Sequence, residues 1–139
     1  MYVETSALLK LFIDEEGRQE VLEAIDHEGT DIVTSRLTGI EMRAALAAAR
    51  RGGRITKTAL AAAKSWLDVL MDEVVQMDTS RELGDLAGDL AESERLRGSD
   101  ALHLASALSV STPELFMVTW DRDLARAARR SGLTTVGIV

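Results

Sequence analysis

Short apolar runs alternate with longer amphipathic segments along this chain of 139 residues. The apolar runs are four to six residues long and stop at polar or charged residues, as strands buried in a parallel sheet do. We predict five strands, at residues 1–5, 31–34, 74–77, 115–120 and 134–139. No hairpin turn joins any two of them, so each strand must be followed by a crossover.

Apolar residues spaced three and four positions apart predict helices between the strands. Their apolar faces fall at residues 7–12, 21–25, 37–48, 60–70, 83–90, 102–108 and 124–128. The predicted N-caps are Ser6, Ser35, Thr56, Ser99 and Asp121. In the helix that Gly52 and Gly53 end, the predicted buried stripe is Leu37, Ile40, Ala44, Ala45 and Ala48. The alternation predicts an α/β fold with a mostly parallel central sheet and helices on both faces.

Composition narrows the class of protein. The chain is long enough to bury its own core, so we expect a single domain over residues 1–139. Hydrophobic residues make up 46% of the chain but aromatic residues only 4%, which favours closely packed helices over an all-β sandwich. There is no cysteine, and no apolar run approaches the length of a membrane span. We therefore expect a cytoplasmic protein with no membrane partner.

The formal charge of −7 is concentrated in one part of the chain. Residues 68–94 hold nine acids and one base and sum to −8, so the remainder sums to +1. Residues 36–64 are basic, and a second basic group forms a stripe on one helix face: Arg122, Arg126, Arg129 and Arg130. Charged stripes are often only solvated faces, but these would also let a polyanion approach from one side.

Four segments place an acid just past or beside an apolar run. Glu4 and Asp121 follow the first and fourth strands. Glu41 lies in the helix after the second strand, and Asp100 lies in the first turn of a largely buried helix. Ligand sites of open parallel sheets lie off the carboxyl ends of the strands, so the four acids are predicted to converge on one crevice. Taken alone, Asp100 could simply complement the helix dipole.

Converging carboxylates repel one another unless a cation neutralises them. Mg²⁺ prefers oxygen ligands and is commonly held by one or two carboxylates together with water and substrate phosphates. Mn²⁺ has a similar preference for oxygen and could substitute for it. Such an ion activates water and stabilises the leaving oxygen of a phosphodiester. The four acids therefore suit metal-dependent hydrolysis of a phosphodiester, and this chemistry needs no cysteine and no histidine.

Four blocks of sequence together resemble the PIN-domain ribonucleases, specifically the VapC-type toxins of bacterial toxin–antitoxin pairs. They are residues 2–8, residues 35–38 with Glu41, residues 99–105, and residues 118–121 with Leu124 and Ala125. The blocks follow the family's order and cover essentially the whole chain. The resemblance implies a three-layer α/β/α sandwich and a Mg²⁺-dependent endoribonuclease that cuts structured RNA, such as tRNA or ribosomal RNA.

The resemblance also implies roles for particular residues. The acidic quartet that holds the metal and performs catalysis would be Glu4, Glu41, Asp100 and Asp121, with Asp123 as a further metal ligand. Supporting hydroxyl groups would come from Thr5, Ser6 and Thr119. RNA would be bound by Arg97, Arg122 and Arg126. His103, one turn after Asp100, is expected to be packed or hydrogen-bonded near the site rather than to be a ligand.

Two kinds of protein partner follow from the same resemblance, a cognate VapB-type antitoxin and a second copy of the chain in a homodimer. The alanine-rich segments at residues 44–49 and 59–63 would let two helices pack closely and leave a groove for an amphipathic peptide. Ordinary interior packing of small residues explains the same alanines equally well.

One position departs from the family pattern, because Glu4 stands where the first acid is normally Asp. Because glutamate is one methylene longer than aspartate, two hypotheses about the function of the chain remain open. The chain is either an active nuclease or a catalytically weakened PIN-like domain that acts as a protein- or RNA-binding module. A nucleotide-binding domain fits less well, because the turn at residues 5–7 lacks the glycines of a pyrophosphate loop.

Overall fold

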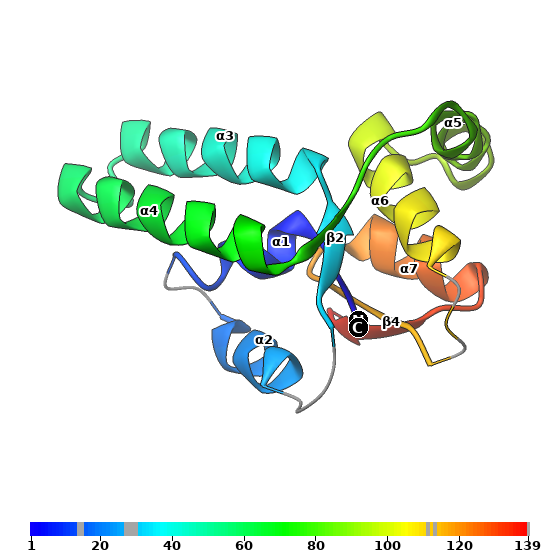
Figure 1. Cartoon of the computed structure of the whole chain (residues 1–139), viewed down its shortest axis with the longest axis horizontal. Coiled ribbons are helices and arrows are strands. Elements are labelled where there is room, and N and C mark those ends of the chain that lie inside the picture. The colour runs from blue at the N-terminus through cyan, green and yellow to red at the C-terminus, as the bar shows by residue number, and fades with distance from the viewer. Residues whose placement is uncertain (14–15, 27–30, 111, 113, 139) are drawn as a thin grey trace.

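Five strands and seven helices alternate along the chain in a computed structural model that describes residues 1–13, 16–26, 31–110, 112 and 114–138 (Figure 1). The strands are β1 (Tyr2–Val3), β2 (Val33–Ser35), β3 (Val75–Met77), β4 (Phe116–Thr119) and β5 (Thr134–Gly137). The helices are α1 (Thr5–Leu9), α2 (Arg18–Ile25), α3 (Leu37–Arg51), α4 (Lys57–Glu73), α5 (Arg81–Glu94), α6 (Gly98–Ser109) and α7 (Arg122–Arg130). No helix in the described ranges is long and apolar enough to span a bilayer.

All five predicted strands are present, and they pair in parallel in the order β3-β2-β1-β4-β5. Val139, the last residue of the fifth predicted strand, lies outside the described residues. The first strand of the chain is the middle strand of the sheet, with β2 on one side and β4 on the other. The residues just after β1 and β4 therefore lie next to each other at the carboxyl edge, where the backbone N–H of Glu4 donates to the carbonyl of Val118.

Two apolar clusters, one on each face of the sheet, confirm the predicted three-layer arrangement. Tyr2 and its register partner Met117 belong to a cluster with α5, α6 and α7. The next pair, Val3 and Val118, belongs to a cluster with α1, α2, α3 and α4. Successive side chains of a strand point to opposite faces, so these two adjacent pairs divide the core between two helical layers.

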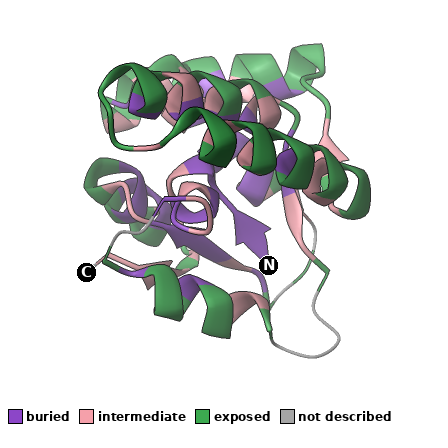
Figure 2. Cartoon of the chain, turned by 90° about the vertical axis from the view of Figure 1, so that its left-hand side faces the viewer, coloured by how far each residue is buried: buried purple, intermediate pink, exposed green. Residues whose placement is uncertain are grey.

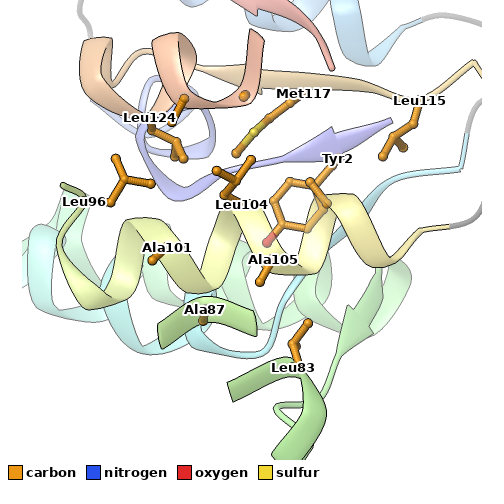
Figure 3. Packing of buried hydrophobic residues seen from close by; sticks show 13 residues of the cluster. Tyr2, Leu83, Ala87, Leu96, Ala101, Leu104, Ala105, Leu115, Met117 and Leu124 are labelled. Atoms are coloured by element: carbon orange, nitrogen blue, oxygen red, sulfur yellow. The ribbon is translucent and has the colours of Figure 1, made fainter. Parts of the chain in front are cut away.

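The helix α6 is the most deeply buried helix and packs directly on the sheet. Residue 101 and residues 103–107 are all buried. Figure 3 shows Leu104 and Ala105 between the strands and α5, with Tyr2 and Met117 pointing toward them. Because α6 is fixed on two sides, its amino-terminal turn, which carries Asp100, is held firmly against the sheet.

Helices α3 and α4 form an antiparallel hairpin that extends beyond the sheet (Figure 1) and is largely exposed in its outer turns (Figure 2). The stripe predicted for α3 is wrong. The buried residues are Thr38, Met42, Leu46 and Ala49, whereas Ile40 is 67% exposed. Alanine fits either face, so Met42 and Leu46 decide the orientation. The polar Thr38 can be buried because its hydroxyl lies 2.7 Å from that of Thr34.

Three of the five predicted helix caps need correction. Glu4, not Ser6, is the N-cap of α1, and α6 begins at Gly98 with Arg97 as its N-cap and no capping side chain. The N-cap position of α3 is Arg36, although the Ser35 hydroxyl still accepts from the backbone N–H of Leu37. Thr56 and Asp121 cap α4 and α7 as predicted.

Candidate active site

Glu4 is buried at the end of β1 and is surrounded by hydrogen-bond donors. It is only 5% exposed, although a residue that directly follows a strand would be expected at the solvent-facing edge of the sheet. Its carboxylate accepts from the backbone N–H and the hydroxyl of Ser6 and from the Thr119 hydroxyl at 2.9 Å. Burial raises the pKa of Glu4, although His103 and these donors oppose the rise. The carboxylate is therefore directed toward its own helix terminus rather than toward open solvent.

The same hydroxyl groups connect Glu4 to the end of β4. Thr119 Oγ1 accepts from the backbone N–H of Asp121 at 3.1 Å, and Ser6 Oγ accepts from the backbone N–H of Trp120 at 2.8 Å. Asp121 in turn uses Oδ1 to accept from Leu124 N–H at the start of α7. We call Glu4, Ser6, Thr119 and Asp121 the strand-end half of the site.

Glu41, in the second turn of α3, receives two donors on one oxygen. Thr5 Oγ1 donates to Oε1 at 2.7 Å, and His103 Nε2 lies 2.7 Å from the same atom. Burial alone would raise the pKa of Glu41, but the hydrogen bonds from His103 and Thr5 outweigh it and leave the pKa below its usual value. Glu41 is therefore held as a carboxylate at neutral pH.

Asp100, in the first turn of α6, has a raised pKa. Burial is the main cause of the raised pKa, and repulsion from Asp121 is the next. Arg97, whose Nε lies 4.0 Å from Asp100 Oδ2, lowers the pKa in part. Repulsion from Glu41 adds to the rise. Asp100 therefore feels the negative charge of acids from two other elements. We call Thr5, Glu41, Asp100 and His103 the helix half of the site.

The structure brings Asp121 and Glu41 within electrostatic range of Asp100, whereas Glu4 is enclosed by hydroxyl groups. Asp123 does not face them, since its exposed carboxylate pairs with Arg126 at 3.1 Å. Across the described residues, no three His, Asp or Glu side chains are arranged to hold a metal ion together.

A divalent cation nevertheless fits this donor set. The side chains offer only oxygen ligands, and the repulsion that raises the pKa of Asp100 is of the kind that a bound cation relieves. Mg²⁺ commonly takes one or two carboxylates and completes its shell with water and phosphate oxygens, so a preformed three-ligand cage is not required.

The arginines predicted to bind RNA are all exposed, and two of them already have acidic partners. Arg97 lies beside Asp100 and Arg126 pairs with Asp123. Arg122 is exposed at the start of α7. The basic stripe of α7 is thus on the surface, as its spacing predicts, and begins at Arg122, directly after Asp121 of the strand-end half.

Tyr2 is a site residue that the sequence did not reveal. Its hydroxyl lies 2.8 Å from His103 Nδ1, and the two rings meet edge to face with centroids 6.0 Å apart. Burial raises the pKa of Tyr2, so the phenol keeps its proton. The one available signal was a tyrosine in an otherwise apolar strand, because a buried phenol needs a polar partner.

Comparison with known proteins agrees with this fold. The sequence matches the PIN domain family over residues 1–130. The chain belongs to the PIN-domain family.

Curated relatives narrow the assignment of the chain within the PIN-domain family. Ribonuclease VapC45 and Ribonuclease VapC49, both from Mycobacterium tuberculosis, are each 39% identical over 134 residues, which cover 95% of this chain and 91% of theirs. Within the PIN-domain family the chain therefore groups with the VapC ribonucleases.

Solved structures share the fold at lower sequence identity. VapC20 of M. tuberculosis, described as a sarcin–ricin loop cleaving toxin, has a TM-score of 0.68 at 19% identity and covers 91% of this chain and 93% of its own. FitAB bound to a DNA fragment gives a TM-score of 0.69 at 12% identity, covering 98% of this chain and 93% of that one. These two likenesses concern the fold.

Proposed function

We propose that this chain is a metal-dependent endoribonuclease toxin that cuts structured RNA, such as tRNA or ribosomal RNA, and is held inactive by a cognate antitoxin. The observation that carries the proposal is the gathering of acids from three elements, because partly buried Asp100 of α6 lies within electrostatic range of Asp121 before α7 and of Glu41 in α3. Close kinship with VapC ribonucleases supports the RNA substrate.

In this proposal the acids at the carboxyl edge of the sheet hold Mg²⁺, or Mn²⁺ in its place. Asp100 and Glu41 of the helix half would hold the ion together with Asp121 of the strand-end half, and Glu4 would join them only if its carboxylate left Ser6 and Thr119. When bound, the ion neutralises charge at the phosphodiester and activates water for hydrolysis. Asp123 keeps at most an auxiliary part, because it pairs with Arg126.

The hydroxyl residues and arginines have separate tasks. Thr5 orients Glu41, and Ser6 and Thr119 orient Glu4 through the hydrogen bonds described above. Exposed Arg97, Arg122 and Arg126 bind the RNA backbone on either side of the scissile phosphate, since guanidinium groups bind phosphate oxygens well.

The α3–α4 hairpin is the surface that we assign to the VapB-type antitoxin. Most alanines of the predicted segments are exposed on it, namely Ala44, Ala48, Ala59, Ala61 and Ala62. Large apolar side chains are exposed on it as well, namely Ile40 at 67%, Trp66 at 56% and Val69 at 57%. Exposed apolar groups in one region commonly mark a protein interface. A homodimer is a further expectation, which light scattering of the purified chain would test.

One observation favours the second candidate function, a weakened PIN-like domain that binds RNA or protein without cutting. Glu4, which is one methylene longer than the usual Asp, has its carboxylate enclosed by Ser6 and Thr119. A ligand that is directed inward in this way contributes less to a metal site.

Cleavage of tRNA and ribosomal RNA with and without divalent ions separates the two functions. We expect cutting with Mg²⁺ or Mn²⁺ that stops when a chelator is added and returns when excess metal is restored. Cutting that persists in chelator would exclude the metal mechanism. No cutting under any condition, with retained RNA binding, would favour the binding module.

A further inference from the structure

His103 is a fully buried polar residue that the proposed mechanism does not use. It lies on the buried side of α6, and both of its ring nitrogens have partners. Nδ1 lies 2.8 Å from the Tyr2 hydroxyl, and Nε2 lies 2.7 Å from Glu41 Oε1. A buried imidazole with two partners of this kind suggests a task beyond filling space.

The directions of these hydrogen bonds follow from the donor and acceptor chemistry. The carboxylate of Glu41 can only accept, so Nε2 must carry the hydrogen. In the neutral ring Nδ1 is then an acceptor, and the Tyr2 hydroxyl donates to it. The chain of donors runs from Tyr2 through His103 to Glu41, and it joins β1, α6 and α3.

The same oxygen of Glu41 also accepts from Thr5 at 2.7 Å. Two donors on Oε1 fix both the rotation of the carboxylate and the direction of its other oxygen. Without them a long, partly exposed glutamate side chain has several rotamers available. Misplacement of a reacting group by about 1 Å can cost on the order of a hundredfold in rate.

We propose that His103 is a positioning residue which, held by Tyr2, fixes the carboxylate of Glu41 in the orientation that a divalent cation requires. The inference rests on the proposed function for the identity of the cation, and it adds a residue outside the acidic quartet. Outer partners of this kind typically change metal affinity or activity by about 10–100-fold when they are removed.

The geometry predicts one tautomer for the parent protein. Nitrogen NMR of the metal-free full chain should show His103 with hydrogen on Nε2 and none on Nδ1. Tyr2→Phe should disturb this pattern, because Nδ1 then lacks its donor. Hydrogen on Nδ1 with none on Nε2 would overturn the inference, because Nε2 could then not donate to Glu41. This measurement does not depend on any cleavage assay.

Three variants test the effect on metal binding. His103→Leu removes the donor to Glu41, whereas His103→Gln keeps an N–H donor at about the same reach. Thr38→Val is the matched control, because it removes a buried hydroxyl from α3 that bonds Thr34 and no member of the His103 chain. Thermal melts of each variant report on folding.

The main measurement is the Mn²⁺ affinity of each variant, obtained from titrations monitored by calorimetry or by the magnetic resonance signal of free Mn²⁺. The second measurement is kcat and KM for RNA cleavage. We expect His103→Leu to weaken Mn²⁺ binding about tenfold or more and to lower kcat more than it raises KM. His103→Gln should recover most of the loss, and Thr38→Val should bind as the parent does.

Equal Mn²⁺ affinity in the parent and His103→Leu, or equal losses in His103→Gln and His103→Leu, would overturn the positioning role and leave the proposed function intact. A parent that binds no Mn²⁺ would overturn the proposed function and this role with it. If His103→Leu does not fold, Tyr2→Phe takes its place, because it removes the hydroxyl that holds His103. Weaker Mn²⁺ binding in Tyr2→Phe than in Thr38→Val then supports the positioning role, and equal binding in these two variants contradicts it.

Discussion

The two halves of the site hold the same kind of side chain in opposite ways. Glu4, in the strand-end half, is almost fully buried, and burial raises its pKa in spite of three donors. Glu41, in the helix half, is half-buried, and its donors lower its pKa in spite of burial. The difference shows that loss of water governs the first carboxylate and hydrogen bonding governs the second. The helix half is therefore the part that is ready for a cation, and the strand-end half mainly ties β1 to β4.

The largest effect should come from removing the charge of Asp100. We expect Asp100→Asn to lower metal-dependent RNA cleavage by on the order of a hundredfold or more. Its fold should persist, because the lost carboxylate was itself repelled by Asp121 and Glu41. Cleavage assays at matched Mg²⁺ concentration, with thermal melts, check both points.

The matched control for that variant is Asp89→Asn, which changes an exposed acid of α5. It should cut as the parent does. If Asp100→Asn also cuts at the rate of the parent, the site has been assigned to the wrong residues.

Shortening the acid in the strand-end half should have the next largest effect, in the opposite direction. Glu4→Asp restores the family's usual residue, and aspartate is also a better N-cap for α1 than glutamate. We expect faster metal-dependent cleavage, by about tenfold, with little change in melting temperature. A slower Glu4→Asp enzyme would mean that Glu4 is an adapted ligand in its present position.

Neutralising Glu4 should stabilise the metal-free protein at neutral pH. Because its folded pKa is raised, the folded state of the parent loses stability as the pH rises above the ordinary value of 4.5. Glu4→Gln lacks this loss, so its advantage should grow from about pH 4.5 upward. A gain on the order of 1 kcal/mol corresponds to about 3–5 °C in Tm for a chain of this size. Thermal melts of the parent and Glu4→Gln in the presence of a chelator, from pH 4.5 to pH 7, measure this difference in Tm. A Glu4→Gln variant less stable than the parent at pH 7 would contradict the prediction.

A change in stability of similar size but opposite sign is expected at Glu41. Its folded pKa is lowered, so the stability it contributes is present above the ordinary pKa and is lost as the pH falls through the folded value. Glu41→Gln should therefore be less stable than the parent at neutral pH, by about 1 kcal/mol, as charged hydrogen bonds become neutral ones. The difference should vanish in acid. If the two Gln variants shift Tm in the same direction at pH 7, the contrast between the halves does not hold.

The elements of the fold were predictable because their signals are local. Leu83 and Ala87 in α5, and Leu124 with Ala127 and Ala128 in α7, are buried as their spacing predicts. Helix α3 was misread because alanine carries little information about which side faces the core, so the larger Met42 and Leu46 set the orientation.

The environment of the site depended on partners far apart in the chain. The four acids were identified from the segments around them, but the burial of Glu4 depends on Thr119, 115 residues later. The partner of His103 is Tyr2, 101 residues earlier. No local pattern specifies such pairs, because they form only when β1 inserts between β2 and β4.

The central place of β1 has a consequence for the timing of synthesis. The ribosome makes β1 first, yet β1 must wait for β4 before it has a neighbour on its second side. Chains grow at about 5–20 residues per second, so the 115 residues between Glu4 and Thr119 take roughly 6–23 s to add. During that interval the acids of the two halves cannot meet. The acids of the two halves therefore come together only after β4 has been translated.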